Sequence, residues 1–177
     1  MPASSLSLVP ATLAHAEALL AFELENRAFF EQWIASRGDA FYALEHVVSH
    51  LAAAEADRAA DRSYGYLVYA DQTLVGRVNL RGIERQQFHR AMLGYRIGEP
   101  YVGKGYATGA VRLVLTEAFA SLGLWRVEAV VREGNPGSHR VLERNHFQQY
   151  GRSTRSVQYR GRWYDLHHYE RHRDRNP

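Results

Sequence analysis

A short segment with two glycines, Tyr101-Val102-Gly103-Lys104-Gly105-Tyr106-Ala107-Thr108, constrains the fold of this chain more than any other feature. It follows a stretch of β-type composition at residues 91–97 and precedes apolar residues that recur at helical spacing. We therefore expect a strand to turn into a helix near Gly105. Glycines let the backbone turn without Cβ clashes, and the unpaired amides at a helix start attract anions. The segment predicts a phosphate cradle into which a pyrophosphate would fit.

Two common nucleotide-binding templates do not fit this segment. The phosphate loop of nucleotide hydrolases needs four residues between its first glycine and Gly-Lys-Ser/Thr, and the sequence contains no such run. The dinucleotide fingerprint Gly-x-Gly-x-x-Gly needs a glycine at the position of Thr108, and Gly109 comes one residue too late. After these two templates are excluded, the segment shows only a strand, a glycine turn and a helix. This local pattern by itself is a weak indication of an anion site.

The chain from Met92 to Asp165 resembles the GCN5-related N-acetyltransferase (GNAT) family. Within that family it resembles the RimJ/RimL branch, which acetylates the N-termini of ribosomal proteins. The matching motifs follow the branch in order and include Gly94-Tyr95-Arg96-Ile97, the segment 101–108, Phe119, Leu122-Gly123-Leu124, Arg126-Val127, Asn135-Pro136-Gly137-Ser138, Val141-Leu142-Glu143-Arg144, Phe147 and Gly161-Arg162-Trp163-Tyr164-Asp165.

The resemblance implies that acetyl-CoA is the cosubstrate. In the family the glycine loop holds the pyrophosphate of coenzyme A through backbone amides, and the preceding strand pairs with the pantetheine arm. Asn135 is expected to bond the pantetheine amides. The residues implied to line the cosubstrate are Ile97, Val102, Gly103, Lys104, Gly105, Tyr106, Ala107, Thr108, Asn135 and Ser138.

Three positions depart from the family pattern. Val102 replaces the usual Gln or Arg at the head of the loop, which should weaken binding without abolishing it because main-chain groups hold the phosphates. Gly109 replaces the usual Glu of the branch and costs the helix about 1 kcal/mol relative to alanine. His146 replaces a glycine, so Asn145 and His146 must make the turn after the helix at residues 136–144.

The reaction needs a proton donor for the departing thiolate. Many relatives place a tyrosine seven residues after Asn135, but this chain has Leu142 there. The branch offers Ser138 instead, whose hydroxyl could donate to the sulfur or could cap the following helix. The backbone amide of Ile97 is implied to polarise the acetyl carbonyl.

The residue that removes the proton from the attacking amine is left open by the sequence. Glu99 is the first candidate for this catalytic role because it lies just before the cradle, and Glu84, Glu128 and His89 are the alternatives. A relay through ordered water would need no side chain at the amine. Phe29 and Trp33 are expected to shape the groove for the acceptor, because the family builds that wall from its early helices.

The order of patterns predicts one α/β domain over residues 1–177, with a mixed and mostly antiparallel sheet flanked by helices. In the acyl-CoA N-acyltransferase fold that the resemblance implies, two parallel strands splay apart to leave a slot for the acetyl group. Those strands are predicted at residues 92–97 and 125–131. The remaining strands are expected at residues 6–9, 64–70, 73–80, 147–159 and 162–171, and the helices at 13–24, 26–35, 43–60, 105–122 and 136–144.

The composition of the chain bears on the mechanism of acetyl transfer and on the cellular location of the protein. The 177 residues include no cysteine, which excludes an acyl-cysteine intermediate and favours direct transfer in a ternary complex. The start of the chain lacks signal-peptide features and no apolar run approaches membrane length, so we expect a cytoplasmic protein without a membrane partner. The net charge of +3 and the basic tail at 170–177 do not favour nucleic acid. Exposed strand edges are compatible with a homodimer.

Metal binding is not expected from the histidine pairs. His46 and His50 share a helical face, and His168 and His172 repeat the spacing, but zinc needs a third ligand. The sequence as a whole predicts an acetyl-CoA-dependent N-acetyltransferase acting on a protein N-terminal amine. The alternatives are acetylation of a polyamine or aminoglycoside, which a strongly acidic groove would favour, and a noncatalytic acetyl-CoA sensor.

Overall fold

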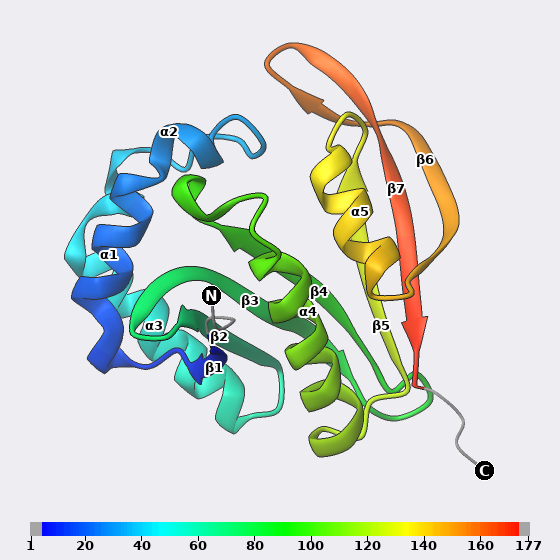
Figure 1. Cartoon of the computed structure of the whole chain (residues 1–177), viewed down its shortest axis with the longest axis horizontal. Coiled ribbons are helices and arrows are strands. Elements are labelled where there is room, and N and C mark those ends of the chain that lie inside the picture. The colour runs from blue at the N-terminus through cyan, green and yellow to red at the C-terminus, as the bar shows by residue number, and fades with distance from the viewer. Residues whose placement is uncertain (1–4, 174–177) are drawn as a thin grey trace.

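The computed structural model describes residues 5–173, in which seven strands form one sheet (Figure 1). The strand order is β1-β2-β3-β4-β5-β7-β6, so β1 and β6 are its edges. All neighbouring strands are antiparallel except β4 and β5, which are parallel. The strands are β1 (Leu6–Pro10), β2 (Ser63–Ala70), β3 (Thr73–Glu84), β4 (Arg90–Ile97), β5 (Arg126–Arg132), β6 (Gln148–Tyr159) and β7 (Arg162–His172).

Helices cover both faces of the sheet because alternate strand residues point to opposite sides. Val68 of β2 packs in one core with α4 (Tyr106–Thr116) and α5 (Pro136–Arg144). Its neighbour Leu67 packs in a second core with α1 (Ala16–Glu25) and α3 (Leu44–Ala59). The shorter helices are η1 (Leu13–His15), α2 (Arg27–Phe30), η2 (Asp39–Tyr42), η3 (Glu99–Tyr101) and η4 (Glu117–Ser121). Within the described residues, none of these helices is long and apolar enough to cross a membrane.

The parallel strands β4 and β5 separate soon after they meet, as Figure 1 shows. They pair only from Arg90↔Arg126 to Met92↔Glu128. Beyond this point β4 continues along β3 as far as Ile97, and β5 continues along β7 as far as Arg132. A gap therefore opens between the carboxyl ends of two neighbouring strands. The predicted mixed sheet with two splayed parallel strands is confirmed.

The predicted helix at residues 26–35 is shorter in the structure. α2 ends at Phe30, and the chain then forms turns, with Trp33 donating its N–H to the Phe30 carbonyl at 2.9 Å. The carbonyl of the next residue, Glu31, accepts hydrogen bonds from outside the helix, namely from Tyr159 and Arg160 of the β6–β7 hairpin. A helix needs such carbonyls for its own N–H groups, so contacts from the far end of the sequence end it early.

Two other local predictions differ in detail, whereas the turn formed by Asn145 and His146 is as predicted. The helix after the glycine turn leaves regular α geometry at Glu117 and continues as the π-helical turn η4. In the turn after α5, His146 takes the left-handed conformation with φ 59°, while the Asn145 side chain ties α5 to α4 by donating to the Thr108 carbonyl at 3.2 Å. Residues 170–172, expected in the basic tail, pair with β5 as part of β7. Positions 174–177 lie outside the described residues.

The structure explains the unusual Gly109 in α4. A Cβ built at this position would lie 2.6 Å from Leu6 Cδ2, closer than side chains approach one another. The helix therefore packs closely against β1, and a larger residue at this position would require the Leu6 side chain to move. The loss of helix propensity predicted from the sequence is accompanied by a close contact between α4 and the edge of the sheet.

Candidate active site

A cavity of about 850 Å³ opens where β4 and β5 diverge. Its walls come from β3, β4 and β5, from the beginnings of α4 and α5, from the loop after α2, and from β6. The gap between the two strands connects the face of the sheet covered by α4 and α5 with the face covered by α1 and α2. Two molecules could therefore approach one another from opposite faces of the sheet.

The glycine segment forms an open backbone turn at the start of α4. Gly103 and Gly105 have φ values of 77° and 85°, in the left-handed region, and a Cβ at either position would meet no atom within 4 Å. Gly105 is the N-cap, no side chain caps the helix, and its first turn carries no acidic residue. Gly109 N–H donates to the Gly105 carbonyl at 2.9 Å, so the amides that precede it have no intrahelical acceptor. This geometry fits a pyrophosphate.

Most of the predicted cosubstrate residues lie together in this cavity. Lys104 does not line it, and its ammonium lies 5.7 Å from the centre of the Tyr101 ring. The predicted residues found in the lining are Ile97, Val102, Gly103, Gly105, Tyr106, Ala107, Thr108, Asn135 and Ser138, together with the acceptor candidates Phe29 and Trp33.

The start of α5 faces the cradle. Asn135 is the N-cap, and its Oδ1 accepts from the backbone N–H of Ser138 at 3.1 Å. Capping is thus performed by Asn135, which leaves its Nδ2 group as a donor, and the Ser138 side chain is not needed as a cap. The structure therefore assigns the helix cap to Asn135 and not to Ser138.

Tyr95 lies beside Ser138 and was given no role by sequence reasoning. Its hydroxyl donates to the Ser138 carbonyl at 3.3 Å, and its side chain lines the cavity. Burial raises the pKa of Tyr95 to about 12, so the phenol keeps its proton at neutral pH. The Gly94-Tyr95-Arg96-Ile97 motif was the available signal, but nothing in its spacing shows that the ring points toward α5.

The candidates for a general base do not come together at the cavity. Glu99 begins η3 and is exposed; its backbone N–H donates to Asn26 Oδ1 at 2.7 Å and its carbonyl accepts from the Val102 N–H at 3.3 Å. Glu84 and Glu128 form ion pairs with Arg90 near the closed end of the β4–β5 pair. His89 precedes β4 at that same end. Among the described residues, the cavity lining contains no Asp, Glu, His or Lys.

Arginine is the charged residue that does line the cavity. Two of the guanidinium groups belong to α5 and lie on the side of the glycine turn, while the others come from β3, β4, β5 and the loop after α2. These residues are Arg37, Arg77, Arg81, Arg96, Arg132, Arg140 and Arg144. Because no carboxylate of the described residues shares the lining, the cavity is electropositive.

A buried carboxylate behind the cavity wall holds two of these arginines. Glu23 of α1 is 1% exposed, and its two oxygens accept from Arg77 at 2.7 Å and from Arg96 at 2.9 Å. Burial lowers the pKa of Arg96 to about 10 despite the attraction of Glu23, and the charge of Arg77 contributes to the lowering. The group nevertheless remains charged at neutral pH. Glu23 therefore fixes two adjacent cations on paired strands.

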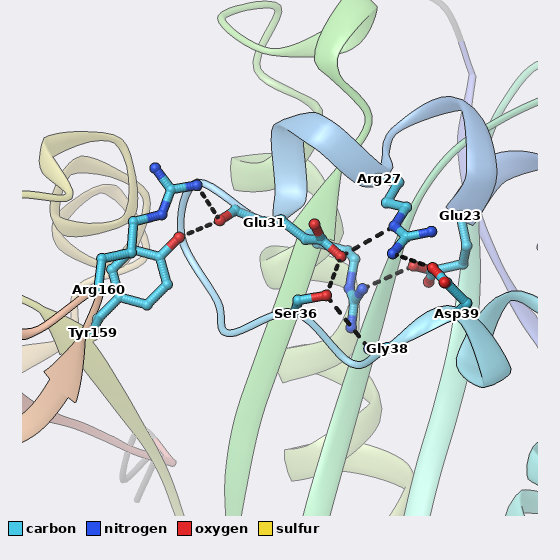
Figure 2. A network of polar contacts seen from close by, with 9 residues as sticks. Glu23, Arg27, Glu31, Ser36, Gly38, Asp39, Tyr159 and Arg160 are labelled. Carbon is cyan, nitrogen blue, oxygen red and sulfur yellow. Dashed lines mark hydrogen bonds and ion pairs between the residues drawn. The ribbon is translucent and has the colours of Figure 1, made fainter.

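A network of polar contacts fixes the loop after α2 (Figure 2). The Glu31 carboxylate accepts from Arg27 at 3.2 Å and from Ser36 at 2.8 Å, while its carbonyl accepts from Tyr159 and Arg160. The loop is thus held to α2 on one side and to the β6–β7 hairpin on the other. Both segments contribute to the cavity wall, so these contacts hold two parts of that wall together.

Aromatic rings surround Arg132 at this end of the cavity. Its guanidinium carbon lies 5.8 Å from the ring centre of Trp33, 4.3 Å from that of Tyr159 and 4.9 Å from that of Tyr164. Arg132 Nη2 also donates to the Gln32 carbonyl at 3.2 Å. Trp33, predicted to shape the acceptor groove, is therefore held beside β5 and the hairpin.

The parallel strands that diverge over a glycine turn define an acyl-CoA N-acyltransferase fold. The chain belongs to the GNAT acetyltransferase family, because the family model described as "Acetyltransferase (GNAT) domain" matches residues 5–148. It is accordingly an acetyl-CoA-dependent N-acetyltransferase. This finding confirms the family and the enzyme class expected from the sequence. It therefore favours the enzyme over the alternative prediction of a noncatalytic acetyl-CoA sensor.

Similar proteins share both sequence and architecture. "Probable N-acetyltransferase YjcK" of Bacillus subtilis is 36% identical over 158 residues, which cover 88% of this chain and 87% of that protein. RimJ of Mycobacterium smegmatis, solved with a CoA-disulfide, has a TM-score of 0.89 at 25% identity, covering 97% of this chain and 83% of RimJ. An acetyltransferase from Salmonella typhimurium, described as modifying the N-terminal serine of ribosomal protein L7/L12, shares the fold with a TM-score of 0.84 at 24% identity and 98% coverage of both chains.

Proposed function

We propose that the enzyme acetylates the α-amine of a polypeptide N-terminus by direct transfer from acetyl-CoA in a ternary complex. The observation that carries this proposal is that the described cavity lining holds no Asp, Glu, His or Lys side chain to act as a general base. Only a neutral amine attacks a thioester, and this lining has no Asp, Glu or His to deprotonate an ammonium group. The acceptor should therefore be an amine that loses its proton readily in water.

An α-amine meets this requirement better than a lysine side chain. Free α-amino groups have pKa values of about 7.7–8.0, against about 10.4 for lysine. At pH 7 the neutral form is then roughly 200 to 400 times more abundant for the α-amine. The guanidinium groups of Arg77, Arg81 and Arg96 around the cavity favour the neutral form further, because nearby positive charge lowers the pKa of an ammonium group.

The residues on the α4 and α5 side of the sheet are suited to hold the cosubstrate. Acetyl-CoA supplies the activated acetyl thioester when bound. We assign the backbone amides of residues 103–108 to its pyrophosphate and the Nδ2 group of Asn135 to its pantetheine amides. The Ile97 backbone N–H is assigned to the acetyl carbonyl, where a donor would stabilise developing negative charge.

Ser138 is proposed to donate a hydrogen bond to the sulfur, and Tyr95 to hold Ser138 in place. Ser138 lines the cavity, and the Tyr95 hydroxyl donates to the Ser138 carbonyl at 3.3 Å. A thiol has a pKa of about 8.5, well below that of either hydroxyl. Neither residue therefore has to give up its proton, because a hydrogen bond suffices to stabilise a thiolate that water can protonate. Glu99 is not retained in this proposal.

The charge of the cavity weighs against polyamines and aminoglycosides. These acceptors are polycations, and an acidic groove would have favoured them. The described lining contains seven arginines and no acidic residue, so it would repel such molecules. The name of the structural relative from Salmonella typhimurium agrees with an N-terminal substrate, but at 24% identity it supports the fold alone.

Two peptides of one sequence test the proposal. The first has a free α-amine and an acetylated lysine, and the second has an acetylated N-terminus and a free lysine. We expect kcat/KM, followed as thiol release at pH 7, to be at least about 100-fold higher for the first peptide because a larger fraction of its amine is neutral. Spermidine and an aminoglycoside serve as further acceptors. Equal rates for the two peptides, or faster turnover of a polycation, would contradict the proposal.

A further inference from the structure

The arginines on the α1 and α2 face of the sheet form a surface separate from the cradle. On β3, Val78 and Leu80 lie in the core with α4, so Arg77, Asn79 and Arg81 point to the opposite face. Arg96 on β4 is the Cα partner of Arg77 and shares their face. We call Arg37, Arg77, Arg81 and Arg96 the acceptor-side arginines, because they lie across the sheet from the glycine turn.

The acceptor-side arginines carry more charge than their surroundings neutralise. Glu23 compensates one charge of the pair Arg77 and Arg96. Arg37 and Arg81 have no ion-pair partner among residues 5–173. Four guanidinium groups and one carboxylate leave a net charge of about +3 on this wall. The fold thus holds about three positive charges on this wall that no carboxylate of the described residues neutralises.

A polar side chain without a partner lies within the same wall. Asn79 Oδ1 is buried and has no hydrogen-bond partner among the described residues. Asn79 pairs across β3 and β4 with Gly94, where a Cβ would lie 2.7 Å from this oxygen and 3.4 Å from Arg81 Nη2. Gly94 therefore leaves room for the Asn79 amide and the Arg81 guanidinium on the cavity floor. An unpaired buried amide is costly unless a bound molecule satisfies it.

The phosphates of acetyl-CoA do not explain this charge. Arg140 and Arg144 belong to α5, which packs with α4 on the opposite face of the sheet, and they line the cavity beside the cradle. These two residues are placed to meet the cosubstrate phosphates. The acceptor-side arginines are left for the second molecule in the cavity.

We propose that the acceptor is an acidic N-terminal peptide, with Asp or Glu within the first residues after its reactive amine. Its carboxylates would pair with the acceptor-side arginines, and its amine or first amide would meet Asn79. This inference rests on the proposed function and adds the charge of the substrate. Successive residues of an extended chain lie about 3.3–3.6 Å apart, so acidic side chains at the second and third positions stay close to the amine.

Three peptides that differ only at positions two and three test the inference. They begin Ser-Glu-Glu, Ser-Gln-Gln and Ser-Lys-Lys and share the rest of their sequence. We expect kcat/KM to fall in that order, with at least about a tenfold difference between the acidic and the basic peptide at low salt. The difference should shrink as ionic strength rises from about 0.05 to 0.5 M, because salt screens exposed charges.

A pair of variants locates the effect. In Arg81→Gln the acidic-to-basic ratio should fall by about threefold or more, since one unneutralised guanidinium is removed from the acceptor wall. In Arg140→Gln the same charge is lost on the cosubstrate side, so the KM for acetyl-CoA should rise while the ratio stays unchanged. Arg77 and Arg96 are unsuitable for this test because they hold the buried Glu23.

The outcomes separate this inference from the proposed function. Equal turnover of the three peptides, or a preference for the basic one, would overturn the inference and leave N-terminal acetylation standing. The same would follow if Arg140→Gln changed the ratio as much as Arg81→Gln. Free glutamate and 2-aminoethyl phosphate are included as small anionic amines. If the enzyme acetylated only these small amines and none of the peptides, both the inference of an acidic peptide and the proposed N-terminal acetylation would be overturned.

Discussion

The Glu23→Ala variant is expected to lose about 3–5 kcal/mol of unfolding free energy, a large share of the stability of a domain of this size. Glu23 is 1% exposed and bonds both Arg77 and Arg96, whose side chains are 13% and 22% exposed. Removing the carboxylate leaves two neighbouring guanidinium groups partly buried without a counter-charge. Their mutual repulsion and poor solvation should weaken the contact between α1 and the strands β3 and β4.

Urea denaturation measures this loss, and Glu25→Ala is the matched control. Glu25 ends the same helix, is exposed, and forms no ion pair in the described structure. Alanine favours helix at both positions, so propensity does not account for a difference between the two variants. Equal unfolding free energies for Glu23→Ala and Glu25→Ala, within about 0.5 kcal/mol, would contradict the role given to the buried carboxylate.

Gly105→Val is expected to raise the Kd of acetyl-CoA by about 100-fold. At φ 85° the backbone of Gly105 lies where a β-branched residue is strongly disfavoured, so the turn must change shape. Its amides would then point away from the phosphates. Losing two charge-assisted hydrogen bonds at about 1.5 kcal/mol each corresponds to this factor.

The control for this variant is Gly123→Val. Gly123 has φ 62° and, like Gly105, open space where a Cβ would lie, but it follows η4 and does not line the cavity. Both variants should lose stability from backbone strain, and only Gly105→Val should lose affinity. Calorimetric titration with acetyl-CoA would contradict the cradle if the two variants bound the cosubstrate equally well.

The cradle could be predicted because its signals are local, whereas the two splayed parallel strands were expected from the family resemblance. Glycine spacing and helical periodicity placed the start of α4 near Gly105, where the structure has its N-cap. Helix ends that depend on distant contacts were less predictable. The helix that was expected to reach residue 35 ends at Phe30, where Tyr159 and Arg160 bond the next carbonyl from more than a hundred residues away.

The acceptor side of the cavity could not be predicted for the same reason. Its arginines are distributed over β3, β4 and a loop, and Glu23 is 54 residues from Arg77 and 73 from Arg96. No spacing in the sequence shows that these side chains share one wall. Glu99 was chosen because it is close to the cradle in the sequence, yet its side chain does not line the cavity. Tyr95 was part of a matching motif, but only the packing of β4 against α5 shows its hydroxyl beside Ser138.

The central claim is that the reaction depends on the neutral form of the acceptor amine and not on a base of the enzyme. The pH dependence of kcat/KM for two acceptors of different basicity tests this claim most directly. One peptide should begin with an ordinary α-amine and the other with the more basic amine of β-alanine. Without an enzymic base, kcat/KM should rise through the pKa of each free amine and then level off. No falling limb is expected up to about pH 9, because Tyr95, with a pKa of about 12, keeps its proton and Arg96, with a pKa of about 10, keeps its charge. The midpoint should therefore move with the acceptor, whereas a midpoint that stays the same for both peptides would reveal a titrating base in the enzyme.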